Sequence, residues 1–297
     1  TIHGENFVLR VLDAKRGIVE YRKLGLTEDQ YYLLDLMLAR PEGIILVTGP
    51  TGSGKTTTLY SVLSHMNDES VNIMTLEDPV EYPITRIRQT SISDGSKIDF
   101  SDGVRSLMRQ DPDIILVGEV RDKDTAEMAF RAAMTGHQVF STLHTNSALR
   151  SFQRIKDLGV SPEVMAGNII GIVAQRLVRR VCVHCREEVQ VTEGSIEARL
   201  IGAHAVGRTV YRAHHGGCEA CGFQGYKGRL AIMELLRMDS MLDELITRNA
   251  TLGELTAHAM AHGFVPMAED GLRRVLEGIT SIEEVGRVVD LTVRLSR

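Results

Sequence analysis

The 297-residue chain contains no tryptophan, and aromatic residues make up only 5% of it. Its net charge is −5, so the composition offers no excess of basic side chains to follow a phosphate backbone. Proteins that bind single-stranded nucleic acid usually interleave aromatic and basic side chains, and the sequence has no such stripe. These absences weigh against a dedicated nucleic-acid-binding protein.

Long apolar runs are also absent. No run reaches the roughly 18–20 residues that a membrane-spanning helix needs, and no signal peptide is visible. The hydrophobic content of 43% and the charged content of 25% are typical of a globular protein with room for two modest domains. Because the chain begins at Thr1 rather than at a methionine, we expect it to be a fragment.

The most informative stretch is residues 49–56, which satisfy the phosphate-binding loop pattern G-x-x-x-x-G-K-[ST] at every fixed position. Residues 44–48 before it form an apolar run typical of a buried strand, and residues 57–64 after it have the pattern of a helix. This context predicts a nucleoside triphosphate site. Its residues are Gly49, Pro50, Thr51, Gly52, Ser53, Gly54, Lys55 and Thr56, with Thr57 directly behind them.

The residue types of this loop suit phosphate. Its glycines can adopt positive φ without a Cβ clash, so backbone N–H groups can point at phosphate oxygens. The positive end of the following helix faces the same oxygens. Lys55 adds a full charge near the β- and γ-phosphates, and the Thr56 hydroxyl is a natural Mg²⁺ ligand. A glycine-rich turn would explain the glycines but not Lys55 and Thr56 behind them.

Carboxylates follow two further apolar runs. Glu77 and Asp78 directly follow the apolar run of residues 71–76, and Glu119 directly follows that of residues 113–118. The carboxyl ends of strands lie beside the nucleotide in open α/β sheets, so we expect Glu119 to act as the general base that polarises the attacking water. A solvated acidic turn stays an alternative for residues 77–81, as does a surface turn for Glu119.

Strands and helices alternate over residues 44–160, which predicts an α/β fold with a mostly parallel, doubly wound sheet. Residues 100–110 are expected to form a helix with Arg105 and Arg109 on one face. Residues 138–143 are expected to form a strand bracketed by two histidines. A lone histidine is usually a hydrogen-bonded structural residue, but in a nucleotide-binding fold His144 can sense the γ-phosphate.

The four cysteines form two C-x-x-C pairs, namely Cys182 with Cys185 and Cys218 with Cys221. Tetrahedral Zn²⁺ accepts four thiolates at this local spacing, so the pattern predicts a zinc site. A redox pair would need one such motif rather than two, and disulfides fit less well. Residues 186–217 between the pairs are expected to form a loop.

The remaining segments are predicted mainly as helices. Thr27 is expected to cap a helix over residues 28–40, and residues 162–177 have a helical pattern. A small helical bundle is expected at the end, over residues 242–249, 252–262, 269–277 and 282–290. Residues 7–12 look like a strand, which we expect to belong to a sheet that lies mostly outside this chain.

Taken together, these segments resemble the secretion or traffic ATPases, the motors of type II secretion and type IV pilus assembly. Four ordered boxes carry the resemblance: residues 49–58, the acidic residues 76–79, residues 109–122 and the histidine segment 135–146. The match continues through residues 174–177, the four cysteines and residues 225–229. The resemblance implies a RecA-like P-loop NTPase core, a zinc-knuckle insertion and a C-terminal helical subdomain.

The resemblance also implies residue roles. Lys55 and Thr56 would bind phosphates and Mg²⁺, Glu119 would be the catalytic glutamate, and His144 would contact the γ-phosphate region. Glu77 would support the metal or the water. Two arginines would reach the nucleotide, Arg10 from the N-terminal sheet and Arg105 from the helix before the second nucleotide motif.

One departure from the family concerns Asp102, which stands where secretion relatives often have a further arginine, three residues before Arg105. Part of the positive charge at that place is therefore missing. The cysteines Cys182, Cys185, Cys218 and Cys221 resemble the zinc knuckle of assembly-type members, which retraction motors usually lack.

The resemblance implies an ATP-hydrolysing homo-hexamer that uses ATP, Mg²⁺ and Zn²⁺. It would lie in the cytoplasm, peripherally on the inner membrane, and work with a membrane platform protein rather than with nucleic acid. The expected domains are a remnant of an N-terminal sheet domain (residues 1–26), the ATPase core (27–177), the tetracysteine subdomain (178–236) and the helical subdomain (237–297). The alternatives are a pilus retraction ATPase, a nucleic-acid motor on the same core fold, and a nucleotide-binding scaffold without catalysis.

Overall fold

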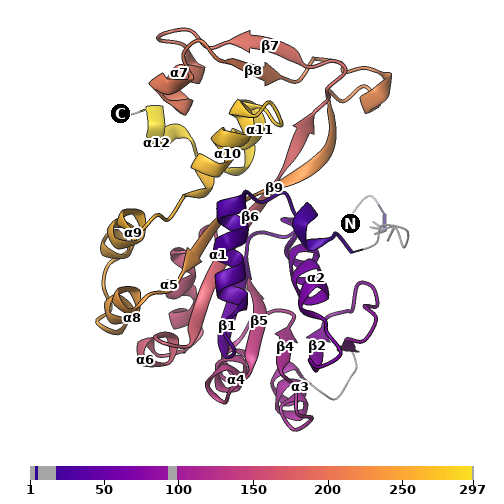
Figure 1. The fold of residues 1–297 in the computed structure, drawn as a ribbon, viewed down its shortest axis with the longest axis vertical. Coiled ribbons are helices and arrows are strands. Elements are labelled where there is room, and N and C mark those ends of the chain that lie inside the picture. Colours follow the sequence, from indigo (N-terminus) through magenta and orange to yellow (C-terminus); the bar gives the residue numbers. More distant parts are fainter. Residues whose placement is uncertain (1–3, 6–17, 93–98, 296–297) are drawn as a thin grey trace.

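A computed structural model describes residues 4–5, 18–92 and 99–295 (Figure 1). The strand predicted over residues 7–12 and its Arg10 lie outside the described residues. At the start of the described core, Thr27 caps α1 (Glu28–Leu38) as predicted, because its side chain accepts a hydrogen bond from the Gln30 backbone N–H. None of the described helices is long and apolar enough to cross a membrane.

A seven-stranded sheet runs through the protein in the order β3-β2-β4-β5-β1-β6-β9. All neighbouring strands are parallel except the β6–β9 pair, which confirms the mostly parallel α/β fold. The strand β5 separates β1, which precedes the phosphate loop, from β4, which precedes Glu119. The strands are β1 (Gly43–Thr48), β2 (Ile73–Glu77), β3 (Arg88–Ser91), β4 (Ile114–Val117), β5 (Gln138–Leu143), β6 (Ile169–Val181) and β9 (Tyr226–Arg237).

Helices cover both faces of this sheet because successive residues of a buried strand point to opposite sides. In β1, Ile44 and Leu46 pack into the core beneath α3 (Phe100–Leu107), α4 (Lys123–Met134) and α5 (Arg150–Asp157). Ile45 and Val47 pack with α1 and α2 (Lys55–Met66) on the other face. The carboxyl ends of the central strands are thereby held by packing on both sides.

The helix predicted over residues 162–177 is wrong for most of its length. Only α6 (Pro162–Met165) is helical, and β6 begins at Ile169. The apolar residues that follow are buried on both faces of β6, which lies between β1 and β9. A continuous apolar run of this kind does not distinguish a buried helix from a buried strand, and here sheet pairing on both edges decides the outcome.

The long strands β6 and β9 extend beyond the central sheet and carry the cysteine lobe, which we define as residues 182–225. In Figure 1 this lobe lies at one end of the molecule, opposite α3 and α6. The sequence predicted a loop for the span between the cysteine pairs, but this span also contains regular structure. It forms β7 (Glu187–Gln190), α7 (Ile196–Ile201) and β8 (Thr209–Arg212), and β7 and β8 pair as antiparallel strands.

The C-terminal helices agree with the prediction within a few residues. They are α8 (Ser240–Thr247), α9 (Leu252–Ala261), α10 (Met267–Leu276) and α11 (Ile282–Val288), followed by the short α12 (Thr292–Leu295). Leu242 and Leu255 of α8 and α9 join the core of the main sheet, whereas Leu272 and Val285 of α10 and α11 pack with the cysteine lobe.

Candidate functional site

The phosphate loop connects β1 to α2, as the sequence predicted. Gly52 and Gly54 have φ values of 78° and 90°, a left-handed conformation that side chains with a Cβ disfavour. Gly54 caps α2, whose first residue is Lys55. The free N–H groups of the first turn of α2 therefore face the loop, where they can bind an anion.

The ammonium group of Lys55 lies folded over this loop. It donates hydrogen bonds to the carbonyl oxygens of Gly49 (2.9 Å) and Pro50 (3.4 Å). Burial lowers the pKa of Lys55, with nearby Arg176 acting in the same direction and Glu119 opposing both. An anionic ligand at the loop would favour the charged form of this lysine, because an opposite charge stabilises a desolvated ammonium.

Glu119 follows β4 and lines the same cavity as the phosphate loop. One carboxylate oxygen lies 2.9 Å from His144 Nε2, and the other lies 2.9 Å from a guanidinium nitrogen of Arg121. The Glu119 side chain is 19% exposed, and the bond from Glu119 is the main cause of the raised pKa of Arg121. The structure thus brings together the expected base and the expected histidine, and adds an arginine that the sequence analysis did not select.

Glu77 is buried at the end of β2, and hydrogen bonds surround its carboxylate. It accepts from the hydroxyl of Tyr60 in α2, from the Thr75 hydroxyl at 2.5 Å, and from the Gln89 side-chain amide at 3.3 Å. Burial and the bond to Glu77 raise the pKa of Tyr60 beyond its ordinary range. These partners fix the position of Glu77, which still lines the cavity beside the loop.

These groups surround one cavity of about 680 Å³. The carboxyl ends of the strands and the amino-terminal end of α2 line it, so it combines hydrogen-bond donors with carboxylates. Oxygen atoms from Thr56, Glu77 and Glu119 suit a hard cation such as Mg²⁺. Its functionally relevant lining residues are Thr51, Gly52, Ser53, Gly54, Lys55, Thr56, Thr57, Tyr60, Glu77, Asp78, Glu119, Arg121, His144 and Arg229.

The sequence predicted two arginines at the nucleotide, Arg105 and Arg10. Arg105 on α3 does not line this cavity and pairs instead with Asp102 one turn earlier, at 2.8 Å. The exposed Arg229 of β9 does line it. Arg229 belongs to a segment that the sequence analysis used for the family resemblance without assigning it a role. Arg10 lies outside the described residues.

The back of the site depends on two residues of β6 that sequence reasoning missed. The Gln175 side chain accepts a hydrogen bond from the Thr58 hydroxyl and donates one to the Ser53 carbonyl oxygen. Arg176 donates to the backbone and side-chain oxygens of Asn146, two residues after His144. Two signals were available, the family resemblance over residues 174–177 and a pair of polar residues inside an apolar run, where an unpartnered polar group would be costly.

The four cysteines converge as predicted. The Sγ atoms of Cys182, Cys185, Cys218 and Cys221 all lie within 4.8 Å of one another, and three of the pairs are 3.9 Å apart. A tetrahedron with Zn–S bonds of about 2.3 Å has edges of about 3.8 Å, so the cluster fits zinc. Backbone N–H groups of Cys218 and Gly225 donate to the Cys221 sulfur, and such bonds lower its pKa to about 6.

The chain is similar to known proteins over nearly its whole length. A sequence model of the family described as type II/IV secretion system protein matches residues 1–287. The type II secretion system protein E of Pseudomonas aeruginosa is 45% identical over 287 residues, which cover 96% of this chain and 56% of that protein. The type IV pilus assembly ATPase TfpB of Acinetobacter baylyi is 44% identical, with coverages of 98% and 50%. The chain therefore spans about half the length of these relatives.

Two solved structures resemble the fold. The crystal structure of the pilus retraction motor PilT with bound ADP has a TM-score of 0.69 and 30% sequence identity, and the match covers 95% of this chain and 69% of that one. The X-ray structure of the Legionella pneumophila ATPase DotB has a TM-score of 0.65 at 22% identity, over 91% and 64% of the two chains. The second likeness concerns the fold alone.

Proposed function

Because this chain belongs to the type II/IV secretion system protein family, we propose that it hydrolyses ATP, and that the protein of which it is part drives pilus or pseudopilus assembly in type IV pilus formation or type II secretion. One observation carries the proposal. The Lys55 ammonium, the Glu119–His144 pair and the amino-terminal end of α2 meet at a single cavity. PilT, which resembles this chain, was crystallised with ADP.

The loop residues would bind the phosphates. Backbone N–H groups at the start of α2 and the Lys55 ammonium would neutralise the β- and γ-phosphate oxygens. On nucleotide binding, the Lys55 ammonium would exchange its hydrogen bonds to the carbonyl oxygens of Gly49 and Pro50 for bonds to phosphate oxygens. Thr56 would hold Mg²⁺ together with carboxylates of the cavity, and the ion would supply charge neutralisation between the β- and γ-phosphates.

Glu119 would accept the proton of the attacking water. In the structure both of its oxygens are engaged, one by His144 and one by Arg121. The γ-phosphate offers both His144 and Arg121 another anionic partner, so its arrival would draw them from Glu119. The freed carboxylate would then orient water for in-line attack. The negative charge that develops on the phosphate would be met by Lys55, His144 and Arg121.

The cysteine cluster supports assembly rather than retraction as the role of the whole protein. Its four sulfurs fit a structural Zn²⁺, which would be bound by Cys182, Cys185, Cys218 and Cys221. We propose that the protein works at the cytoplasmic face of the inner membrane with a platform protein of the secretion or pilus machinery. The alternative of a retraction motor has the solved PilT structure in its favour.

Hexamer formation would complete the site with charge from a neighbouring copy. Arg105 does not line the cavity, and an arginine finger typically contributes a factor of about 10³–10⁵ to phosphoryl transfer. We therefore expect the ATPase rate per chain to rise with protein concentration. A dilution series that combines light scattering with phosphate release tests this, and a high constant rate from a monomer would contradict it.

The function itself is tested by steady-state phosphate release from Mg-ATP, measured alone, with anionic lipid vesicles and with DNA. We expect measurable turnover that vesicles increase and DNA leaves unchanged. Stimulation by DNA alone would favour the nucleic-acid motor. No turnover under any condition, with ATP bound, would indicate a scaffold without catalysis.

A further inference from the structure

The loop that carries His144 is held by three neighbouring strands. We call residues 144–149, between β5 and α5, the histidine loop. Thr48 at the end of β1 accepts from the Thr145 backbone N–H at 2.9 Å, and Arg176 of β6 donates to Asn146. Glu234 of β9 accepts from the Ala148 backbone N–H at 2.7 Å. The position of His144 against Glu119 thus depends on β1, β6 and β9 together.

Glu234 differs from the other two anchors because it also holds a second element. Its other carboxylate oxygen accepts from the backbone N–H of Met267, the first residue of α10, at 2.9 Å. The residue before α10 is Pro266, which offers no capping side chain. Glu234 in β9 therefore caps the amino-terminal end of α10, and the positive end of the helix favours a carboxylate at this place.

Both oxygens of the Glu234 carboxyl group are used as acceptors in this geometry. Glu234 is 5% exposed, and both of its partners are N–H donors, so both oxygens must accept. Burial raises the pKa of Glu234, whereas the two backbone bonds and the charge of Arg176 lower it. Burying such a group costs free energy, which its two hydrogen bonds offset as long as the histidine loop and α10 keep their positions relative to each other.

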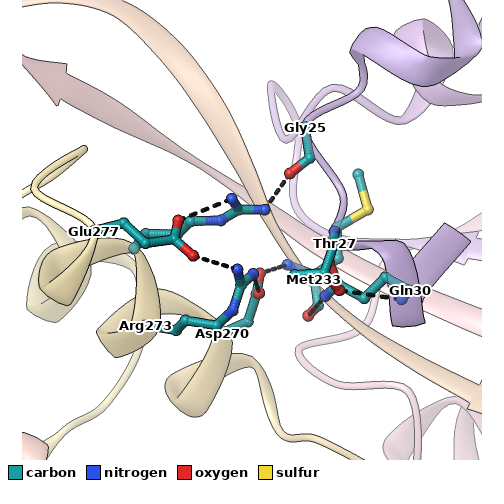
Figure 2. Close-up of polar contacts among 8 residues, drawn as sticks. Gly25, Thr27, Gln30, Met233, Asp270, Arg273 and Glu277 are labelled. Carbon is teal, nitrogen blue, oxygen red and sulfur yellow. Dashed lines mark hydrogen bonds and ion pairs between the residues drawn. The ribbon is translucent and has the colours of Figure 1, made fainter.

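The residue of β9 next to Glu234, Met233, connects α10 to α1 (Figure 2). The Met233 backbone N–H donates to Asp270 of α10, and its carbonyl oxygen accepts from the Gln30 side chain of α1. Arg274 of α10, which is 7% exposed, donates to the carbonyl oxygen of Gly25 and pairs with Glu277. α10 thereby holds the segment that leads into α1.

We propose that Glu234 is a positioning residue that couples the histidine loop to α10, so that a displacement of α10 and of the segment at Gly25 changes the position of His144. This proposal rests on the ATPase function proposed above. It gives the chain a route by which movement of the segment before α1 reaches the catalytic cavity without contacting the nucleotide. In the part of the chain that the structure describes, Arg176 and Thr48 hold the loop without a hydrogen bond to α10, whereas Glu234 bonds to both.

The test compares Glu234→Gln with Glu284→Gln in the full protein that contains this chain. Glu284 is a matched control, because it is 1% exposed and also ties a C-terminal helix to β6 through a backbone N–H, that of Arg179. It has no contact with the histidine loop among the described residues. A glutamine at position 234 offers only one acceptor atom in place of two, and its NH₂ group would face the other N–H donor.

We expect Glu234→Gln to speed amide hydrogen exchange in residues 144–149 and 264–270 together, by about fivefold or more. The kcat for ATP should fall by about tenfold to a hundredfold, since a small misplacement of a catalytic group has this effect. The KM should stay within about threefold, because the phosphate loop is unchanged. Glu284→Gln should instead speed exchange only near residues 179–181 and 281–285.

Unchanged exchange in residues 144–149 of a folded Glu234→Gln protein would overturn the proposal, as would an equal loss of kcat in Glu284→Gln. If Glu234→Gln does not fold, Glu234→Asp replaces it in the exchange experiment. We then expect a smaller increase of amide exchange in both segments, and an increase in only one of them would contradict the coupling. If the parent protein binds ATP but does not hydrolyse it, the proposed function fails, while the exchange measurement still decides the coupling.

Discussion

The nucleotide end of the sheet and the cysteine lobe both hold polar groups in fixed positions, but they do so with very different amounts of core. At the nucleotide end, strands packed on both faces hold Glu77, Glu119 and His144 through protein partners. In the lobe, a two-stranded sheet and a small apolar cluster support four cysteines whose sulfurs face one another. A large core can position a site by itself, whereas a small lobe needs a metal to do so.

The largest effect should come from Lys55→Ala, which removes the only full positive charge within the phosphate loop. We expect the loss of detectable hydrolysis and weaker nucleotide binding, with the fold intact because the nucleotide end depends on its core and not on a ligand. Phosphate release and nucleotide titration measure both effects. Lys123→Ala is the matched control, since Lys123 pairs with Glu127 on the surface, and an equal loss of activity there would contradict the assignment.

Removal of the metal should affect the other region most. We expect one Zn²⁺ per chain in protein purified without a metal-affinity tag. The Cys182→Ser variant should lose this zinc, and proteases should then cleave its residues 182–225. ATP affinity should change by less than about threefold, or under 1 kcal/mol. Val183→Ala, at an exposed position of the same knuckle, should keep the zinc. A folded protein with almost no zinc and four freely titratable thiols would contradict the site.

The sequence predicted the nucleotide end more fully than the lobe for a physical reason. The phosphate loop, Glu119 and His144 follow from local patterns, because a loop between a strand and a helix fixes its own geometry. Arg121, Gln175 and Arg229 reach the site through strand order and pairing, which one sequence does not contain. The β6 strand was mistaken for a helix because its apolar run is buried on both faces.

The role of Arg105 illustrates the same limit. The helix that carries it was correctly predicted, but its side chain turns to Asp102 and not to the cavity. A correctly predicted helix therefore does not by itself fix which partner a charged side chain contacts, and the proposed role of Arg105 stays a prediction. The domain boundaries at residues 26, 177 and 236 stay predictions.

The junction between the lobe and the sheet should show a dependence on acid. Although burial opposes it, hydrogen bonds from Arg287 and Arg179 lower the pKa of Glu284 to about 2. A carboxyl with a depressed folded-state pKa stabilises the fold above its unfolded pKa and loses this contribution as the pH falls. We expect a loss of about 3 kcal/mol in the free energy of unfolding between roughly pH 5 and pH 2.

Urea unfolding at a series of pH values measures this effect. In Glu284→Gln the decrease of stability between pH 5 and pH 2 should be smaller than in the parent protein, because the titrating group is gone. Glu127→Gln serves as a control, since Glu127 is an exposed residue that pairs with Lys123 on the surface. Parallel pH profiles for the parent and Glu284→Gln would exclude Glu284 as the source.

The smallest expected effect is a difference in ATPase kinetics between substitutions of Arg229 and of Arg105. Arg229→Ala should raise the KM for ATP by about tenfold, the equivalent of one bond to a charged group, because Arg229 lines the cavity. Arg105→Ala in a dilute, unassembled preparation should stay within about twofold of the parent. Steady-state kinetics measure both. A larger effect from Arg105 at this dilution would mean that its side chain leaves Asp102 for the nucleotide.

The proposed hydrolysis of ATP at the amino-terminal end of α2 depends on Glu119 as general base. The most direct measurement compares nucleotide affinity and phosphate release in the parent protein and in Glu119→Gln. We predict that Glu119→Gln binds ATP with an affinity close to the parent's but loses turnover, because the neutral amide cannot accept the proton of water. Hydrolysis at the parental rate by Glu119→Gln would contradict the claim.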